Sequence, residues 1–140
     1  MSQESTTPDL VEFARRRVDA ADSRDIDAMM SFLAPDAVWD STPMGLEVFE
    51  GSAAIRRFLE DWWGTWADHS IEVEQVVDLG RGVVFAPVRE DGRLVGSDSR
   101  VEHRRGLVFL FVRGVVARHT AYRDIDEARA AAERLAKERG

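Results

Sequence analysis

The segment from Ser70 to Asp124 most constrains the fold, because nearly all of it follows the pattern of β-strands. It begins with IEVEQVV, in which apolar and polar residues alternate, and the GRG at 80–82 predicts a tight turn after it. VVFAPVRE then runs into Asp91-Gly92, a dipeptide that predicts a hairpin. RVEHRRGLVFLFV and VVARHTAYRD follow, separated by Arg113-Gly114, and both are rich in β-branched and aromatic residues. The sequence therefore predicts four consecutive strands in an antiparallel sheet.

Helical patterns lie on both sides of this strand-rich region. Apolar residues recur at helical spacing from Pro8 to Ala21 and again through SRDIDAMMSFLAPD, which ends near Pro35. A short strand at 37–41 and a second one in LEVFEG lead to a third helix that Ser52 is predicted to cap. The apolar positions of that helix are Ile55, Phe58, Leu59, Trp62, Trp63 and Trp66. A last helix begins at Ile125, and helices segregated from an antiparallel sheet make an α+β fold.

The length of 140 residues corresponds to one domain with a continuous core. We expect that domain to cover residues 8–140 and the polar residues 1–7 to be a disordered tail. A strongly twisted sheet that curls around helices leaves a cone, and side chains or a ligand must fill its mouth.

Composition and charge exclude several classes of function. A net charge of −7 and a pI of about 5.0 oppose binding to nucleic acid, and Arg15-Arg16-Arg17 is interpreted as a solvated helix face. With no cysteine there is no disulfide, thiolate zinc site or cysteine nucleophile, and the three histidines lack the spacing of a helical metal site. No glycine-rich loop opens a helix after a buried strand, so we predict no metal and no cofactor. No signal sequence or membrane span is apparent, which favours a cytoplasmic protein.

Three stretches of the chain resemble the NTF2-like superfamily, and in particular its SnoaL-like branch. They are DIDAMMSFLAPDAVWD at 25–40, FEGSAAIRRFLEDW at 49–62 and FVRGVVARHTAYRDIDEARAAA at 111–132. The resemblance implies a cone-shaped fold in which a curved antiparallel sheet wraps around N-terminal helices and a central pocket. It also implies a homodimer packed through the outer face of the sheet. Because this fold carries isomerases, cyclases, dehydratases, epoxide hydrolases and proteins without catalysis, the site has to decide the function.

The chain departs from the residue patterns of individual enzymes in this superfamily. An ungapped alignment with ketosteroid isomerases places their catalytic aspartate at Ser41 and their helix-one tyrosine near Arg17, while the single tyrosine here is Tyr122. Limonene-epoxide-hydrolase-like enzymes place an arginine between two aspartates in the pocket. The nearest equivalent is RED at 89–91, which runs into the predicted turn and is expected at a loop tip. Polyketide cyclases of this branch use a pocket aspartate with polar helpers that include histidine.

Asp40 and His119 are the candidate catalytic residues. Asp40 either stabilises the turn that follows it or lies against an aromatic wall, where desolvation would raise its pKa and prepare it for proton transfer. His119 shares its strand face with Val115, Ala117 and Ala121, so this small apolar face either packs around a core histidine or leaves room for a ligand.

The other candidates would line the pocket. His103 lies among Arg100, Glu102, Arg104 and Arg105, either at a wet strand end or in a pocket. Tyr122 belongs to the last strand-to-helix junction, where Asp124 is predicted to cap the helix. The tryptophans either pack in the core or line a pocket for a flat, largely apolar ligand, and they are Trp39, Trp62, Trp63 and Trp66.

Three functional hypotheses follow. The first is an enzyme that performs cofactor-independent acid–base catalysis on a small, largely hydrophobic molecule, as an isomerase, cyclase or dehydratase would. The second is a ligand-binding or dimerisation domain without catalysis, and the third is an interaction module with a filled cone. The two longest strands are apolar on both faces, and this excess predicts a homodimer that covers the outer face.

Overall fold

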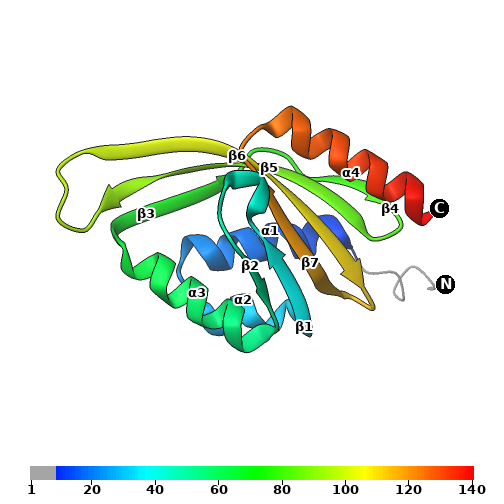
Figure 1. Cartoon of the computed structure of the whole chain (residues 1–140), viewed down its shortest axis with the longest axis horizontal. Helices are drawn as coiled ribbons and strands as arrows, with labels where there is room; N and C mark the ends of the chain where they lie inside the picture. Colours follow the sequence, from blue (N-terminus) through cyan, green and yellow to red (C-terminus); the bar gives the residue numbers. More distant parts are fainter. Residues whose placement is uncertain (1–8) are drawn as a thin grey trace.

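The computed structural model describes residues 9–140. They form one curved sheet with helices on both of its faces (Figure 1). The strands are β1 (Leu33–Asp40), β2 (Val48–Glu50), β3 (Trp66–Val73), β4 (Val77–Gly80), β5 (Val83–Leu94), β6 (Arg100–Val112) and β7 (Val115–Tyr122). The helices are α1 (Leu10–Asp22), α2 (Ile26–Ser31), α3 (Ser52–Gly64) and α4 (Ile125–Arg139). The predicted tail at 1–7 lies outside the described residues.

The α+β class is confirmed, but the sheet is mixed rather than purely antiparallel. Its order is β2-β1-β7-β6-β5-β3, and β4 pairs with β5 beside β3. β1 runs parallel to β7, with Trp39 opposite His119, whereas the other strand pairs are antiparallel. A parallel pair needs a long crossover, and α3 with the intervening strands provides it. The last strand of the chain thereby lies beside the first one.

Aspartates begin three of the helices. The side chains of Asp9, Asp25 and Asp124 each accept a hydrogen bond from the backbone N–H three residues later, at 3.2, 3.0 and 3.0 Å. Such caps satisfy N–H groups that the first helical turn leaves unpaired. The predicted cap at Asp124 is therefore confirmed. Gly51 occupies the cap position of α3, where Ser52 was expected, and Ser52 is the first helical residue.

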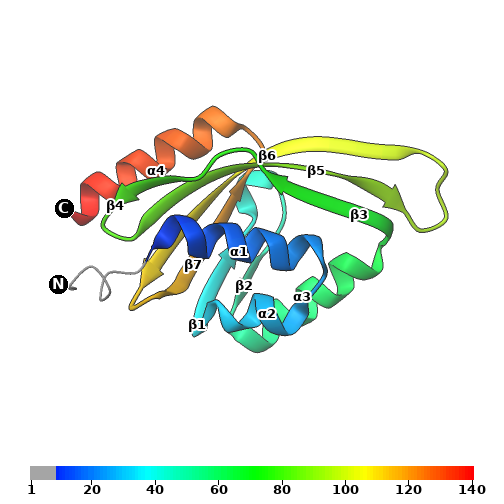
Figure 2. The same cartoon turned by 180° about the vertical axis from the view of Figure 1, so that it is seen from behind.

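The two faces of the sheet are covered by different helices (Figure 2). Along β5, Val84 and Ala86 join the core formed with α1 and α3, whereas Val83 and Phe85 pack under α4. This division follows from the alternation of side chains along a strand. α4 approaches closely, because a Cβ on Gly106 would collide with the Cβ of Ala128.

Several predicted boundaries of helices and strands are wrong. β1 begins at Leu33 and passes through Pro35, so α2 ends earlier than predicted. The alternating run at 71–77 is broken, and its end belongs to β4. α3 ends at Gly64, which places Trp66 at the start of β3 instead of on the helix.

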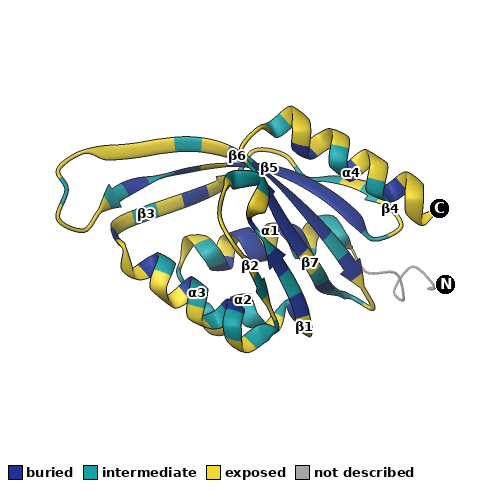
Figure 3. Cartoon of the chain, viewed as in Figure 1, coloured by how far each residue is buried: buried dark blue, intermediate teal, exposed yellow. Residues whose placement is uncertain are grey.

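The largest error concerns Asp91-Gly92, which lies within β5 and makes no turn. β5 and β6 stay paired from Val83–Leu110 to Arg93–Arg100. Gly92 is present because a neighbouring strand is close: a Cβ there would collide with the carbonyl of Asp68 and the indole of Trp66. The hairpin consequently extends beyond the helices, where most of its residues are exposed (Figure 3). In residues 9–140 no helix is long and apolar enough to cross a membrane.

Candidate active site

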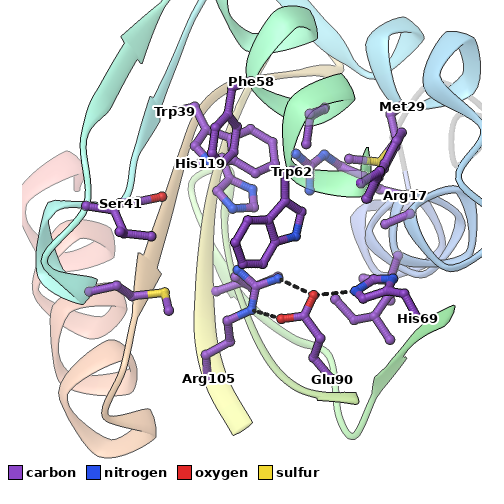
Figure 4. A pocket seen from close by; sticks show the side chains of 18 of the residues that line it. Arg17, Met29, Trp39, Ser41, Phe58, Trp62, His69, Glu90, Arg105 and His119 are labelled. Atoms are coloured by element: carbon purple, nitrogen blue, oxygen red, sulfur yellow. Dashed lines mark hydrogen bonds and ion pairs between the residues drawn. The ribbon is translucent and has the colours of Figure 1, made fainter. Parts of the chain in front are cut away.

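A cavity lies between the concave face of the sheet and helices α1 and α3 (Figure 4). The volume of the cavity is about 60 Å³. This is several times the ~10–15 Å³ that a cavity needs to hold one water molecule. Most of its wall is apolar, with the aromatic rings of Trp39, Phe58, Trp62 and Trp63. Its polar members are Arg17, Ser41, His69, Glu90, His103, Arg105 and His119. The cavity therefore contains all three histidines of the chain.

Glu90 is a buried carboxylate that joins two imidazoles. It is 1% exposed, and its oxygens lie 2.6 Å from Nε2 of His69 and 2.7 Å from Nε2 of His103. The sheet brings these groups together, because Glu90 pairs with His103 across β5 and β6, and β3 lies on the other side of β5. All three side chains face the concave side of the sheet. The site therefore assembles from three separate strands.

The ionisation of Glu90 fixes the tautomer of both histidines. Burial alone would raise the pKa of Glu90, but the hydrogen bond from His69, the charge of Arg105 and the hydrogen bond from His103 lower it to about 2. An ionised carboxylate only accepts hydrogen bonds, so each Nε2 carries a proton. Nδ1 of a neutral ring is then a proton acceptor. Nδ1 of His69 is buried and has no hydrogen-bond partner among residues 9–140. This pairing is suited to general base catalysis.

Two arginines bring positive charge into the cavity. Arg105 lies beside Glu90, with Nε 3.4 Å from one carboxylate oxygen and Nη2 3.4 Å from the other. Arg17 comes from α1 and is 2% exposed, with its guanidinium carbon 5.1 Å from the ring centre of Trp39 and 4.9 Å from that of Phe109. Burial and the nearby Arg105 lower the pKa of Arg17 to about 9. The interpretation of Arg17 as part of a solvated face is wrong, whereas Arg15 and Arg16 are exposed.

His119 lies flat against Trp39, its neighbour across the parallel strands β7 and β1. The ring centres are 3.7 Å apart and the planes differ by 10°, while the ring of Phe109 lies 5.4 Å from His119. Within the described part of the chain neither ring nitrogen of His119 has a hydrogen-bond partner, and the residue is 2% exposed. Burial, followed by the charges of Arg17 and Arg105, holds the pKa of His119 well below its ordinary value. The imidazole is therefore neutral.

The remaining tryptophans lie at different depths. Trp62 and Trp63 line the cavity from α3, as Trp39 does from β1. Trp66 is buried behind the cavity wall, with its ring centre 5.8 Å from that of Trp62 and 4.9 Å from that of His69. It therefore supports the site without lining the cavity.

Asp40 and Tyr122 lie away from the cavity. Asp40 accepts hydrogen bonds from the N–H and the hydroxyl of Thr42 at 2.9 and 2.6 Å, and Nη2 of Arg118 lies 2.7 Å from its other oxygen. Its side chain points to the opposite face of β1 from Trp39, so the geometry matches the turn-stabilising alternative. Tyr122 packs in the cluster under α4. Neither residue is part of the cavity wall.

Sequence analysis missed Glu90, His69, Arg17 and Arg105 as site residues. The signal for Glu90 was its position in the strand: every second residue lies on the same face, and Glu90 follows Val84, Ala86 and Val88 in this alternation. It therefore lies on the concave face once β5 is extended past Gly92. RED at 89–91 is thus mid-strand, and only its central glutamate points inward. For Arg17 the signal was its spacing from Ala14 and Ala21 on the buried face of α1.

The two positions that align with ketosteroid isomerase catalysts do lie in the cavity wall. Ser41 is 3% exposed and Arg17 is 2% exposed, and both contribute to the wall. The cavity is therefore in the place that the alignment implies, with a different chemistry at these positions. In the described part of the chain no group of three or more acidic, histidine or cysteine side chains is arranged to hold a metal ion.

Solved structures with the same fold are similar to this chain at low sequence identity. One is a protein of ketosteroid isomerase-like fold from Catenulispora acidiphila in complex with trimethylamine, with 12% identity, a TM-score of 0.71, and 83% of this chain and 85% of that chain covered. Another is TerC co-crystallised with polyporic acid, with 16% identity, a TM-score of 0.70, and 88% and 97% covered. A third is an LEH-like epoxide hydrolase from M. tuberculosis, with 15% identity, a TM-score of 0.68, and 91% of each chain covered.

The family comparison agrees with the fold. Among curated proteins none matches this chain. Residues 14–119, which include most of the cavity wall, match the SnoaL-like domain. The fold is the NTF2-like cone that the resemblance implied, with N-terminal helices inside a curved sheet. The chain therefore belongs to the SnoaL-like domain family of the NTF2-like superfamily.

Proposed function

We propose that the cavity binds a small, largely hydrophobic molecule and that an imidazole paired with Glu90 moves a proton on it without a cofactor. The observation that carries this proposal is the buried contact of Glu90 with His69 and His103 inside a wall that is mostly apolar. A carboxylate–imidazole pair in a water-poor site is a common arrangement for general base catalysis. Removal of a proton next to a carbonyl is a first step available to isomerisation, aldol-type cyclisation and β-elimination of water.

We assign the role of proton acceptor to Nδ1 of His69, with His103 as the alternative. The side chain of His69 is 1% exposed and its Nδ1 has no hydrogen-bond partner in the described residues, whereas the side chain of His103 is 37% exposed. Glu90 is a positioning residue, because it holds the Nε2 protons and stabilises the imidazolium that forms. His119, a predicted catalytic residue, is proposed as a second proton-handling group, since its neutral ring can donate and accept. Asp40, the other predicted catalyst, is assigned to the turn.

The test is exchange of α-hydrogens for deuterium in small cyclic ketones such as 2-indanone, followed by NMR in D₂O. We expect the wild-type protein to accelerate exchange and Glu90→Gln to lose ~10²-fold or more of that rate, because the imidazole loses the carboxylate that holds its tautomer. His69→Ala should lose a similar factor.

Glu102→Gln is the matched control, because Glu102 lies on β6 with a side chain that is 59% exposed and paired with Arg89. It should exchange like the wild type. Circular dichroism confirms that each variant is folded. Exchange at the rate of buffer alone, or equal rates in the wild type and a folded Glu90→Gln variant, would contradict the proposal.

A second candidate is a ligand-binding domain without catalysis, favoured by the apolar and aromatic character of most of the wall. Binding of small ketones that quenches tryptophan fluorescence, without any deuterium exchange, would support this alternative. The same experiment thus separates the two functions.

We also propose a homodimer in which a partner chain covers the apolar residues of the β5–β6 hairpin. α4 buries Val83, Phe85 and Val108, which account for part of the apolar excess on the outer face of the sheet. The remaining support is the protruding β5–β6 hairpin, where Leu94, Val95 and Val101 are 38%, 65% and 37% exposed. A partner chain could cover these residues.

A further inference from the structure

Arg17 is a buried cation without a full set of partners. It is 2% exposed, and its Nε and Nη2 donors are buried without a hydrogen-bond partner among the described residues. The faces of Trp39 and Phe109 flank the guanidinium and compensate part of its desolvation. They cannot accept hydrogen bonds as an oxygen does, and an unpaired buried charge is costly. The donors of Arg17 therefore need an acceptor that residues 9–140 do not provide.

The charge of the whole cavity has the same sign. Its wall contains two arginines, Arg17 and Arg105, and one carboxylate, Glu90. Nε of Arg105 is likewise buried without a hydrogen bond, although it lies 3.4 Å from Glu90. The two guanidinium groups therefore exceed the single carboxylate by one positive charge. The whole chain has a net charge of −7, yet the charged groups of this cavity leave an excess of positive charge.

We propose that the ligand of this cavity is a flat, largely apolar molecule with an anionic oxygen, a carboxylate or an acidic enol, that binds to Arg17. The oxygen would accept from the free guanidinium donors, and its ring system would lie among Trp39, Phe58 and Trp62. Charge-assisted hydrogen bonds in a dry site are stronger than neutral ones. This inference rests on the proposed function because both concern the same cavity. It adds the chemical class of the ligand.

The test compares a pair of probes that differ in charge and not in shape, 2-naphthoate and 2-naphthamide, by isothermal titration calorimetry at pH 7.5. Benzoate and benzamide serve as the one-ring pair. For at least one pair we expect the wild-type protein to bind the anion about tenfold more tightly than the amide. Arg17→Gln should remove this preference, and Arg17→Lys should keep part of it because the charge remains.

Arg16→Gln is the matched control, since Arg16 is the neighbour of Arg17 on α1 with a side chain that is 61% exposed. It should keep the wild-type preference. Equal affinities for anion and amide in the wild-type protein, no binding of either pair at millimolar concentration, or an unchanged preference in Arg17→Gln would overturn the inference. If Arg17→Gln does not fold, the wild-type ratio and Arg17→Lys decide the outcome.

The two proposals fail separately. Ketone exchange that depends on Glu90, with no preference for the anionic probes, would overturn the assignment of Arg17 and leave the proposed function. A tenfold preference for the anion, with no exchange in any ketone, would support the assignment of Arg17 and contradict catalysis.

Discussion

His119 shows how burial and two neighbouring positive charges change the titration of one side chain. Its pKa is held well below the ordinary value in the folded protein, while the unfolded chain takes up a proton as the pH falls below about 6.5. Proton uptake by the unfolded state alone favours unfolding, so this residue reduces stability as the pH falls from 6.5 and leaves it unaffected above that value.

We therefore predict that the free energy of unfolding falls from pH 6.5 to pH 5 by up to about 1.4 kcal/mol per pH unit more in the wild type than in His119→Gln. Urea unfolding at a series of pH values measures both slopes. Parallel slopes would show that the imidazole titrates normally in the folded protein.

Glu90 and Arg17 show what could be predicted about individual residues from the sequence. The strand alternation that turns Glu90 inward and the helical spacing that buries Arg17 can both be read from the sequence. For Glu90 the Asp91-Gly92 dipeptide, which predicts a turn, outweighed this signal. For Arg17 the run of three arginines outweighed it. The contacts themselves could not be predicted, because Glu90 meets His69 through a strand pairing that local sequence does not specify. Trp39, Trp62, Trp63 and His103 were predicted for the pocket and do line the cavity, although their roles stay predictions.

At the scale of the elements, helix α4 depends on a glycine in the sheet. Gly106 lies opposite Ala128, and a methyl group at this position would collide with the Cβ of Ala128. We predict that Gly106→Ala lowers the free energy of unfolding by ~1–3 kcal/mol, because the close-packed interface must open. Chemical denaturation followed by circular dichroism measures this loss.

Gly64→Ala is the control, because a Cβ at Gly64 meets nothing within 4 Å and the residue lies at the end of α3. It should be neutral or slightly stabilising. A Gly106→Ala variant as stable as Gly64→Ala would mean that α4 tolerates displacement from the sheet.

Most of the order of helices and strands could be predicted from the sequence. The strongly periodic helices and the long strands of the C-terminal half follow from sequence patterning, and the α+β class follows from them. The parallel pairing of β1 with β7 does not, because it joins residues about eighty positions apart. The limits of β1 and β5 were wrong at Pro35 and Gly92. Pro35 lies in an irregularity of β1 between the paired residues Leu33 and Val38, and Gly92 is paired with both β3 and β6.

For the whole molecule, the oligomeric state is the open prediction. A homodimer through the apolar residues of the β5–β6 hairpin would have twice the mass of one chain in sedimentation velocity. Val95→Lys, a change at a residue that is 65% exposed, should shift such a dimer toward the monomer by introducing like charges across the interface. A wild-type protein that sediments with the mass of one chain at high concentration would disprove the homodimer.

Gly92 contributes to the site although it has no side chain. The indole of Trp66 occupies the space above this glycine, and the same indole lies against the imidazole of His69, which in turn meets Glu90. A single added methyl group would therefore pass a displacement along three side chains to the carboxylate. Tolerance to substitution should consequently be low at a position outside the cavity wall, and a survey restricted to that wall would overlook one of the residues that keep its geometry.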